Sequence, residues 1–394
     1  MAKKRRCPRK GMTTKVLRMD RAVTTSLREG QQERIRFWEL DALRGIAALI
    51  IVSAHVELGP WFWSWSMMDM FFILSSFLLT RIVYKQCSDW RGVLSFYGRR
   101  IERIWPLYML TIVGLLLVTL VLNARHGVTT FDLSVFVRLF TFSQYSEMLF
   151  QPVPNSHYLY YARHLWSLAV EEQFYVLLPF AILLLRRLPK ALWLSVVLAI
   201  IAFAIIRRAD DANFYVLTSH ADGFALGSLM AVSLPLLQAH RRPASWALGL
   251  MAGTGLLCFI PYLLAGYTAY AAGGPIFDYL AGPATASTLF WAGSIGLLAL
   301  HRGAGLLAPL RWPVLVHIGH LSYAIYLVHF PILRLLPLPL MARMPGLSEL
   351  SAKLLCLPLI FLLAELLYRL IDRPVQQMQP FRVAPRTKPI HAQP

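Results

Sequence analysis

Long apolar stretches alternate with short polar segments along most of the chain, and many of the polar segments carry lysine and arginine. An apolar helix of about 20 residues rises about 30 Å, which matches the hydrocarbon core of a bilayer. Stretches that fit such helices lie near residues 37–58, 67–84, 104–122, 164–185, 191–206, 213–236, 245–264, 280–300, 313–334 and 349–371. The pattern predicts an all-α fold, a polytopic membrane helix bundle of about ten transmembrane helices.

The basic residues predict how this bundle is oriented. The segments assigned to the cytoplasm are the two terminal tails and the loops 85–103, 186–190, 237–244 and 301–312. This assignment puts 28 Lys and Arg inside and eight outside, the bias that the positive-inside rule requires. We therefore expect a multi-pass protein of the plasma (inner) membrane, with both termini in the cytoplasm and the long segment 123–162 outside. The span at 191–206 is the least secure, because Arg207 and Arg208 would lie outside.

Composition excludes a water-soluble domain with one buried core, because 57% of the residues are apolar, the mean hydropathy is +0.53 and only 15% are charged. The formal charge of +19 does not indicate nucleic-acid binding, since the first 36 residues alone hold 12 Lys and Arg against three Asp and Glu. We expect residues 1–36 to be a disordered cytoplasmic tail able to touch anionic lipid headgroups, 37–374 to be the membrane domain, and 375–394 to be a second cytoplasmic tail.

The four cysteines have no paired spacing and no neighbouring histidine cluster, so the sequence predicts neither a disulfide framework nor a metal site.

The first expected span contains two ionisable residues, Arg44 and His55. They are eleven positions apart, about three helical turns, so both leave the same face about 16 Å apart along the axis. Ionisable residues inside a span normally face the bundle interior or a wet cavity and mark a functional path. The alternative is an Arg44 that reaches the interface and a His55 that only bonds a neighbouring helix.

Further polar side chains recur in later spans. Glu171 and Glu172 enter the fourth span about 100° apart, so one is expected to face the cavity and the other a structural cation. Asp222 lies on a span with a small residue at every fourth position, which predicts close helix packing and an interior Asp222. Ser322, Tyr326 and His329 share one helix face. Lone histidines of the outer segment, His126, His157 and His164, are expected at the surface, and His220 at a cap or the interface.

Arg99, Arg100 and Arg103 are three and four positions apart, so their side chains can converge on one ligand. Guanidinium groups bind phosphate oxygens in bidentate fashion, which makes the cluster suitable for a phosphate-bearing ligand. The alternative is that these residues only set the orientation of the chain.

Several of these features together resemble the motifs of the acyltransferase-3 family, integral membrane enzymes that O-acylate sugars and related acceptors. The stretches that carry the resemblance are the pair Arg44 and His55 and residues 71–79, 99–106, 166–175 and 322–331. Their order covers about residues 37–374, and the resemblance is to the form without a fused hydrolase-like domain.

The resemblance implies transfer of an acyl group, most simply acetyl, from acyl-CoA to a hydroxyl of a cell-envelope glycan or lipid-linked sugar. A small secreted glycoside or antibiotic is the alternative acceptor. Acyl-CoA is then a donor substrate, with no permanently bound cofactor, and its phosphates are expected at the arginine cluster. His55 is the expected centre, as general base or as a transiently acylated group, supported by Arg44 and by Glu171 or Glu172. The remaining candidates for substrate contact or support are Trp166, Tyr175, Asp222, Ser322, Tyr326 and His329.

A transporter or flippase for a polar or lipid-linked substrate is the alternative from another functional class, because polar groups also line transport pathways. The sequence lacks the two-half repeat that many transporters show, which disfavours this reading. Consumption of acetyl-CoA by inverted membrane vesicles would discriminate between the two.

Overall fold

The computed structural model describes residues 37–125, 133–144, 161–209, 215–272 and 283–378. It divides into two units, Met1–Trp38 and Glu39–Pro394, and everything below concerns the second. The predictions for residues 1–36, for His126 and His157, and for most of the outer segment and C-terminal tail lie outside the described residues.

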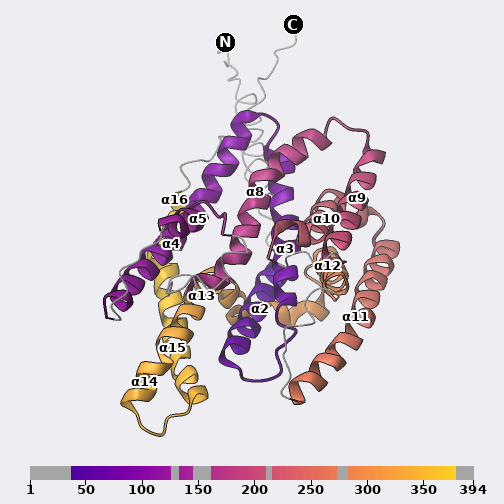
Figure 1. Cartoon of the computed structure of the whole chain (residues 1–394). Helices are drawn as coiled ribbons and strands as arrows, with labels where there is room; N and C mark the ends of the chain where they lie inside the picture. The colour runs from indigo at the N-terminus through magenta and orange to yellow at the C-terminus, as the bar shows by residue number, and fades with distance from the viewer. Residues whose placement is uncertain (1–36, 126–132, 145–160, 210–214, 273–282, 379–394) are drawn as a thin grey trace, which may run out of the picture. The chain divides into compact units, whose positions relative to one another are not determined.

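All elements of the described residues are helices, as the apolar pattern predicts (Figure 1). In chain order they are α2 (Trp38–Val56), α3 (Ser66–Gln86), α4 (Trp90–Arg125), α5 (Leu133–Phe140), η1 (Arg163–Leu165), α8 (Trp166–Leu185), α9 (Lys190–Ala209), η2 (Leu217–His220), α10 (Ala221–Ala239), α11 (Arg241–Ala271), α12 (Ala284–Leu300), η4 (Gly305–Arg311), α13 (Pro313–Leu335), α14 (Pro337–Arg343), α15 (Glu349–Leu367), η5 (Tyr368–Asp372) and α16 (Arg373–Met378). The all-α fold class is confirmed.

Each of the ten expected ranges contains one long helix. Within the described residues, seven helices are long and apolar enough to cross a membrane, and an eighth is added if α12 and η4, bent by 107°, form one span. The other two, α2 and α9, are outside this set. α2 carries Glu39, Asp41 and Arg44 in its first half, so its composition is that of a helix that depends on its neighbours. The count of ten is thus approximate.

Close backbone contacts hold α2 against α13. A Cβ added to Gly319 would collide with the carbonyl oxygen of Asp41, and one added to Gly45 would collide with the carbonyl oxygen of Leu315. Small residues permit this approach in membrane helices, where packing replaces the hydrophobic effect as the driving force. The crossing places Arg44, next to Gly45, beside the first turns of α13.

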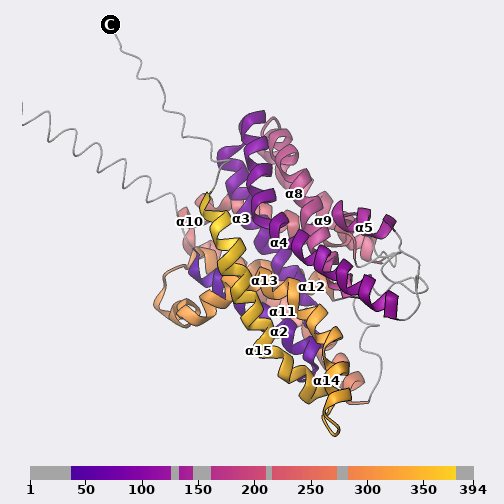
Figure 2. The same ribbon diagram turned by 90° about the vertical axis from the view of Figure 1, so that its left-hand side faces the viewer.

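The small residues of α10 have the expected effect on its packing. A Cβ on Gly227 would collide with Ser76 and with the carbonyl oxygen of Ile73, so α10 lies directly against α3. α12 packs on α3 and α11, and α15 runs alongside α13 in both views (Figures 1 and 2). The helices that surround the site described next, α2, α3, α8 and α13, are thereby fixed from several sides.

Candidate functional site

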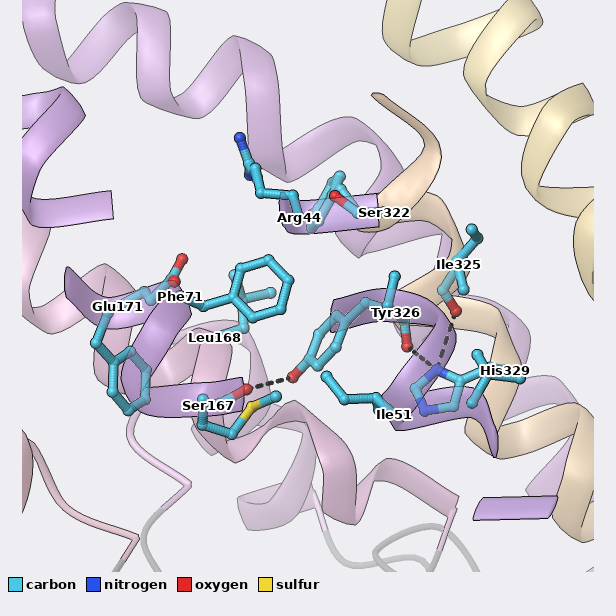
Figure 3. Close-up of a pocket in the computed structure, with 15 residues that line it drawn as sticks. Arg44, Ile51, Phe71, Ser167, Leu168, Glu171, Ser322, Ile325, Tyr326 and His329 are labelled. Atoms are coloured by element: carbon cyan, nitrogen blue, oxygen red, sulfur yellow. Dashed lines mark hydrogen bonds between the residues drawn. The ribbon is translucent and has the colours of Figure 1, made fainter. Parts of the chain in front are cut away.

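A pocket with an empty volume of about 610 Å³, open solvent included, lies between α2, α3, α8 and α13. Apolar side chains form most of its wall, and polar ones stand at separate positions along it (Figure 3). The lining residues that matter for chemistry are Arg44, Ser167, Glu171, Ser322, Tyr326 and His329. Five of these six are candidates from the sequence, and they come from three different helices.

Arg44 and Glu171 form one polar region of the pocket. Glu171 accepts hydrogen bonds from the Ser75 hydroxyl at 3.0 Å and from the Tyr175 hydroxyl at 2.6 Å, which orient its carboxylate. Arg44 is close enough to Glu171 for electrostatic attraction, and its Nε has no hydrogen-bond partner among the described residues. A guanidinium with an unused donor in a partly apolar pocket is suited to an anionic or carbonyl oxygen. Tyr175 therefore supports Glu171 in this structure rather than lining the pocket.

Ser322, Tyr326 and His329 all face this pocket, so the shared helix face predicted from their spacing is confirmed. The Tyr326 hydroxyl donates to the carbonyl oxygen of His164 at 2.5 Å and lies 3.1 Å from Ser167 Oγ. His329 Nδ1 lies 2.8 Å from its own helix's Tyr326 carbonyl oxygen, and only a protonated Nδ1 can donate there. Its Nε2 is buried without a hydrogen-bond partner in the described part of the chain. In the neutral ring this nitrogen carries a lone pair that can accept a proton.

His55 lies against His329, with ring centroids 5.1 Å apart and planes at 69°. Its Nδ1 is 2.9 Å from the carbonyl oxygen of Ile51, one turn back on α2, so its Nε2 is also the available nitrogen. His55 of α2 and His329 of α13 therefore form one pair, which we call the imidazole pair.

His164 is a third histidine at this place, and its expected surface location is wrong. It is 8% exposed, and its ring centroid lies 5.6 Å from that of His329 and 5.1 Å from that of Phe330. η1 turns the chain into α8 and carries His164 inward. Its position two residues before Trp166, at the start of a motif, was the available signal, and the polar segment before it suggested exposure instead.

Glu172 points away from the pocket, as the angle between adjacent residues requires. It is 9% exposed, and one carboxylate oxygen has no hydrogen-bond partner within the described ranges. Its electrostatic partner is Arg100, whose guanidinium also lies over the Phe96 ring at 5.9 Å from the centroid. Glu171 thus lines the cavity and Glu172 does not, and within the described residues no ion pair joins Glu172 to the expected cation.

The three arginines of the cluster face different neighbours. Arg99 donates to Gln86 Oε1 at 2.6 Å and also bonds Ser95. Arg100 lies toward Glu172, whereas the exposed Arg103 is in electrostatic contact with Arg44 and Glu171. None of the three arginines lines the pocket; the charge of Arg103 repels Arg44 and attracts Glu171, which do line it.

Asp222 and Trp166 lie outside the pocket lining. Asp222 forms a buried bidentate ion pair with Arg208, with oxygen to nitrogen distances of 2.6 and 2.8 Å. This pair occupies its carboxylate, so the interior location is right but a substrate contact is not what this geometry offers. Trp166 packs against Tyr215 and His220. His220 is buried, with Nδ1 3.1 Å from an oxygen of Asp69. It occupies the N-cap position of α10, one of the two expected places, but its side chain makes no capping hydrogen bond.

No group of three histidine, cysteine, aspartate or glutamate side chains in the described residues could hold a metal ion. His329, Arg44 and Glu171 line one mostly apolar pocket, whereas His55, the candidate from the first span, lies outside the lining and packs against His329. An imidazole, a guanidinium and a carboxylate in such a pocket suit proton transfer and polarisation of a carbonyl group.

Comparisons with known proteins give a consistent result. The acyltransferase-3 family model, described as an acyltransferase domain, matches residues 37–369. Two similar proteins are a "Putative O-acetyltransferase" of Staphylococcus aureus strain COL, 26% identical over 86% of this chain and 57% of that protein, and the peptidoglycan O-acetyltransferase OatA of Listeria monocytogenes, 26% identical over 86% of this chain and 55% of that protein. The chain thus spans just over half the length of these relatives. No solved structure matches it.

Proposed function

The chain belongs to the acyltransferase-3 family, and we propose that it transfers an acyl group, most simply acetyl, from acyl-CoA to a hydroxyl group of a cell-envelope glycan or lipid-linked sugar. The observation that carries the proposal is one pocket lined by Arg44, Glu171 and His329, with His55 packed against the His329 ring. The names of the two relatives support O-acetylation as the reaction class.

The donor is proposed to enter from the cytoplasmic side of an inner-membrane protein whose termini both face the cytoplasm. Arg103 is the first contact for its phosphates, because the residue is exposed and its charge is felt by Arg44 in the pocket. The apolar wall of the pocket, which includes Ala48, Met68 and Phe71, suits the thioester arm of the donor. Arg100 and Arg99 contribute further positive charge on the same helix as Arg103, at the expected cytoplasmic side.

The reaction is proposed to occur at the imidazole pair. An imidazole Nε2 takes the proton of the acceptor hydroxyl while the hydroxyl oxygen bonds the thioester carbonyl carbon. The carbon–sulfur bond then breaks, the thiolate of CoA leaves, and the proton passes from the imidazolium to that sulfur. His329 supplies the nitrogen that faces the pocket, and His55 packs edge-on against its ring. Neutral imidazole suits this step because its unprotonated nitrogen can take the proton from the hydroxyl and return it to the leaving group.

The acceptor is proposed to reach the imidazole pair from the outer side of the membrane. A glycan or lipid-linked sugar is favoured over a small glycoside by the name of the Listeria relative alone, which specifies peptidoglycan.

A label-transfer assay tests the proposal. The protein in lipid nanodiscs is supplied with acetyl-CoA labelled in its acetyl group and with soluble peptidoglycan fragments or a lipid-linked disaccharide, and the acceptor is analysed by mass spectrometry. Labelled acetyl esters should form with the unaltered protein and not with the double variant His55→Gln, His329→Gln. Transport of acceptor without any consumption of acetyl-CoA would overturn the proposal and favour a transporter.

A further inference from the structure

The residue immediately after α2 has an unusual backbone conformation. Glu57 has a φ of 67° and follows His55 by two positions. Its N–H donates to the carbonyl oxygen of Ala54 and the N–H of Leu58 to that of Ser53, both at 3.1 Å. These two bonds make a Schellman motif, in which the left-handed residue is usually glycine because a Cβ is unfavourable there. A glutamate in this place indicates that its side chain has a role that offsets the strain.

The side chain of Glu57 reaches a buried lysine of α15. Lys353 is 2% exposed, and its Nζ donates to Glu57 Oε1 and to Glu349 Oε1, each at 2.8 Å. A lysine is rarely buried to this extent without a carboxylate partner, because removing the ammonium group from water is costly. Of its two partners among the described residues, Glu349 belongs to α15 itself, so Glu57 is the one that connects Lys353 to a different part of the bundle.

This ion pair joins the end of α2 to α15, and α15 is a packing neighbour of α13. Glu57 is on the chain immediately after α2, which carries His55, and α15 packs along α13, which carries His329. The ion pair between Glu57 and Lys353 therefore links the end of α2, two residues after His55, to the helix that packs along α13. An edge-to-ring contact at 5.1 Å between centroids is sensitive to a small shift of either helix.

From this geometry we propose that Glu57 and Lys353 are positioning residues, and that their ion pair, here called the α2–α15 clamp, holds His55 in register with His329. The inference rests on the proposed function for its effect on turnover. The clamp itself is a statement about helix position and can be tested without any substrate.

The chain offers a matched control. Glu349→Gln removes a carboxylate at the same 2.8 Å distance from Lys353 but leaves the link to α2. Glu57→Gly removes the link and also the backbone strain, so this variant keeps the turn and should fold at least as well as the unaltered protein. Lys353→Met removes the link from the other side.

The first measurement uses nitroxide spin labels on cysteines introduced at the exposed positions Leu58 and Leu350, in a background without the native cysteines. Double electron–electron resonance spectroscopy in nanodiscs then gives the distance distribution between the labels at the ends of α2 and α15. The distribution should stay narrow with Glu349→Gln and broaden with Glu57→Gly and with Lys353→Met. An unchanged distribution with both clamp variants would overturn the inference.

The second measurement is acetyl transfer under the conditions proposed above. Glu57→Gly should lower kcat roughly 10–100-fold with the donor KM unchanged, because only the geometry of the reacting groups is altered. Glu349→Gln should keep near-normal turnover. Broadened distances with unaltered kcat would contradict the positioning role. If the unaltered protein transfers no acetyl group at all, the proposed function fails while the distance measurement still decides the clamp.

Discussion

Replacing Asp222 by alanine should destabilise the protein strongly, because the change leaves a buried arginine without its counter-charge. The exposed fractions of the Arg208 and Asp222 side chains are 6% and 2%, and the pair is bidentate. Breaking a buried ion pair from one side costs about 3–5 kcal/mol, more than the pair contributes relative to an apolar replacement. Arg208 keeps bonds to the Ser219 carbonyl at 2.6 Å and to Thr285 Oγ1 at 2.9 Å, so we expect the lower half of this range.

The assay is thermal unfolding in detergent at one fixed scan rate, since a membrane protein of this size is expected to unfold irreversibly. Asp222→Ala should lower the apparent Tm by roughly 5–10 °C, at about 2–4 °C per kcal/mol or somewhat less for a long chain. The matched control is Glu365→Ala, whose partners His317 and Arg369 have side chains 47% and 67% exposed, and which should change the Tm little. An unchanged Tm together with a raised acceptor KM for Asp222→Ala would refute the structural role and return Asp222 to the substrate candidates.

Two further substitutions test the neighbours of the pocket. His164→Phe keeps a ring beside Phe330 but removes both nitrogens. Because a third imidazole can assist proton movement, kcat should fall about tenfold or more. Normal kcat with normal stability would assign His164 to packing alone. Arg103→Ala should raise the donor KM roughly tenfold or more, as expected for a charge-assisted bond of about 1.5–3 kcal/mol. Arg99→Ala should raise it less, because the Arg99 side chain is hydrogen-bonded to Gln86. Equal effects of the two variants in steady-state kinetics would contradict this difference.

The sequence predicted the parts of this protein that follow from helical periodicity. The ten apolar ranges each contain a long helix, because a bilayer-length apolar run has one way to satisfy its backbone. The spacing of Ser322, Tyr326 and His329 gave their common face, and the spacing of Arg44 and His55 placed both on the inner side of α2. These are properties of one helix at a time.

Contacts between helices were less accessible. His164 was assigned to the surface because the residues before it are polar, and its one local signal, the nearby motif at Trp166, does not indicate that η1 turns it toward α13. The pairing of Asp222 with Arg208 depends on how α9 and α10 pack, and no sequence pattern identifies either residue as the partner of the other. The left-handed Glu57 was missed for the same reason, since its partner Lys353 lies almost 300 residues later.

Single-turnover acetyl transfer in nanodiscs shows whether the imidazole pair takes the proton of the acceptor hydroxyl. His55→Gln and His329→Gln should each lower the rate of label transfer by about 10²–10⁴-fold, and the double variant should lose little more, because the two rings act as one unit. Binding of a non-transferable acyl-CoA analogue should remain near normal in all three variants. Near-normal transfer in both single variants, with the same amount of folded protein in the membrane, would contradict the account.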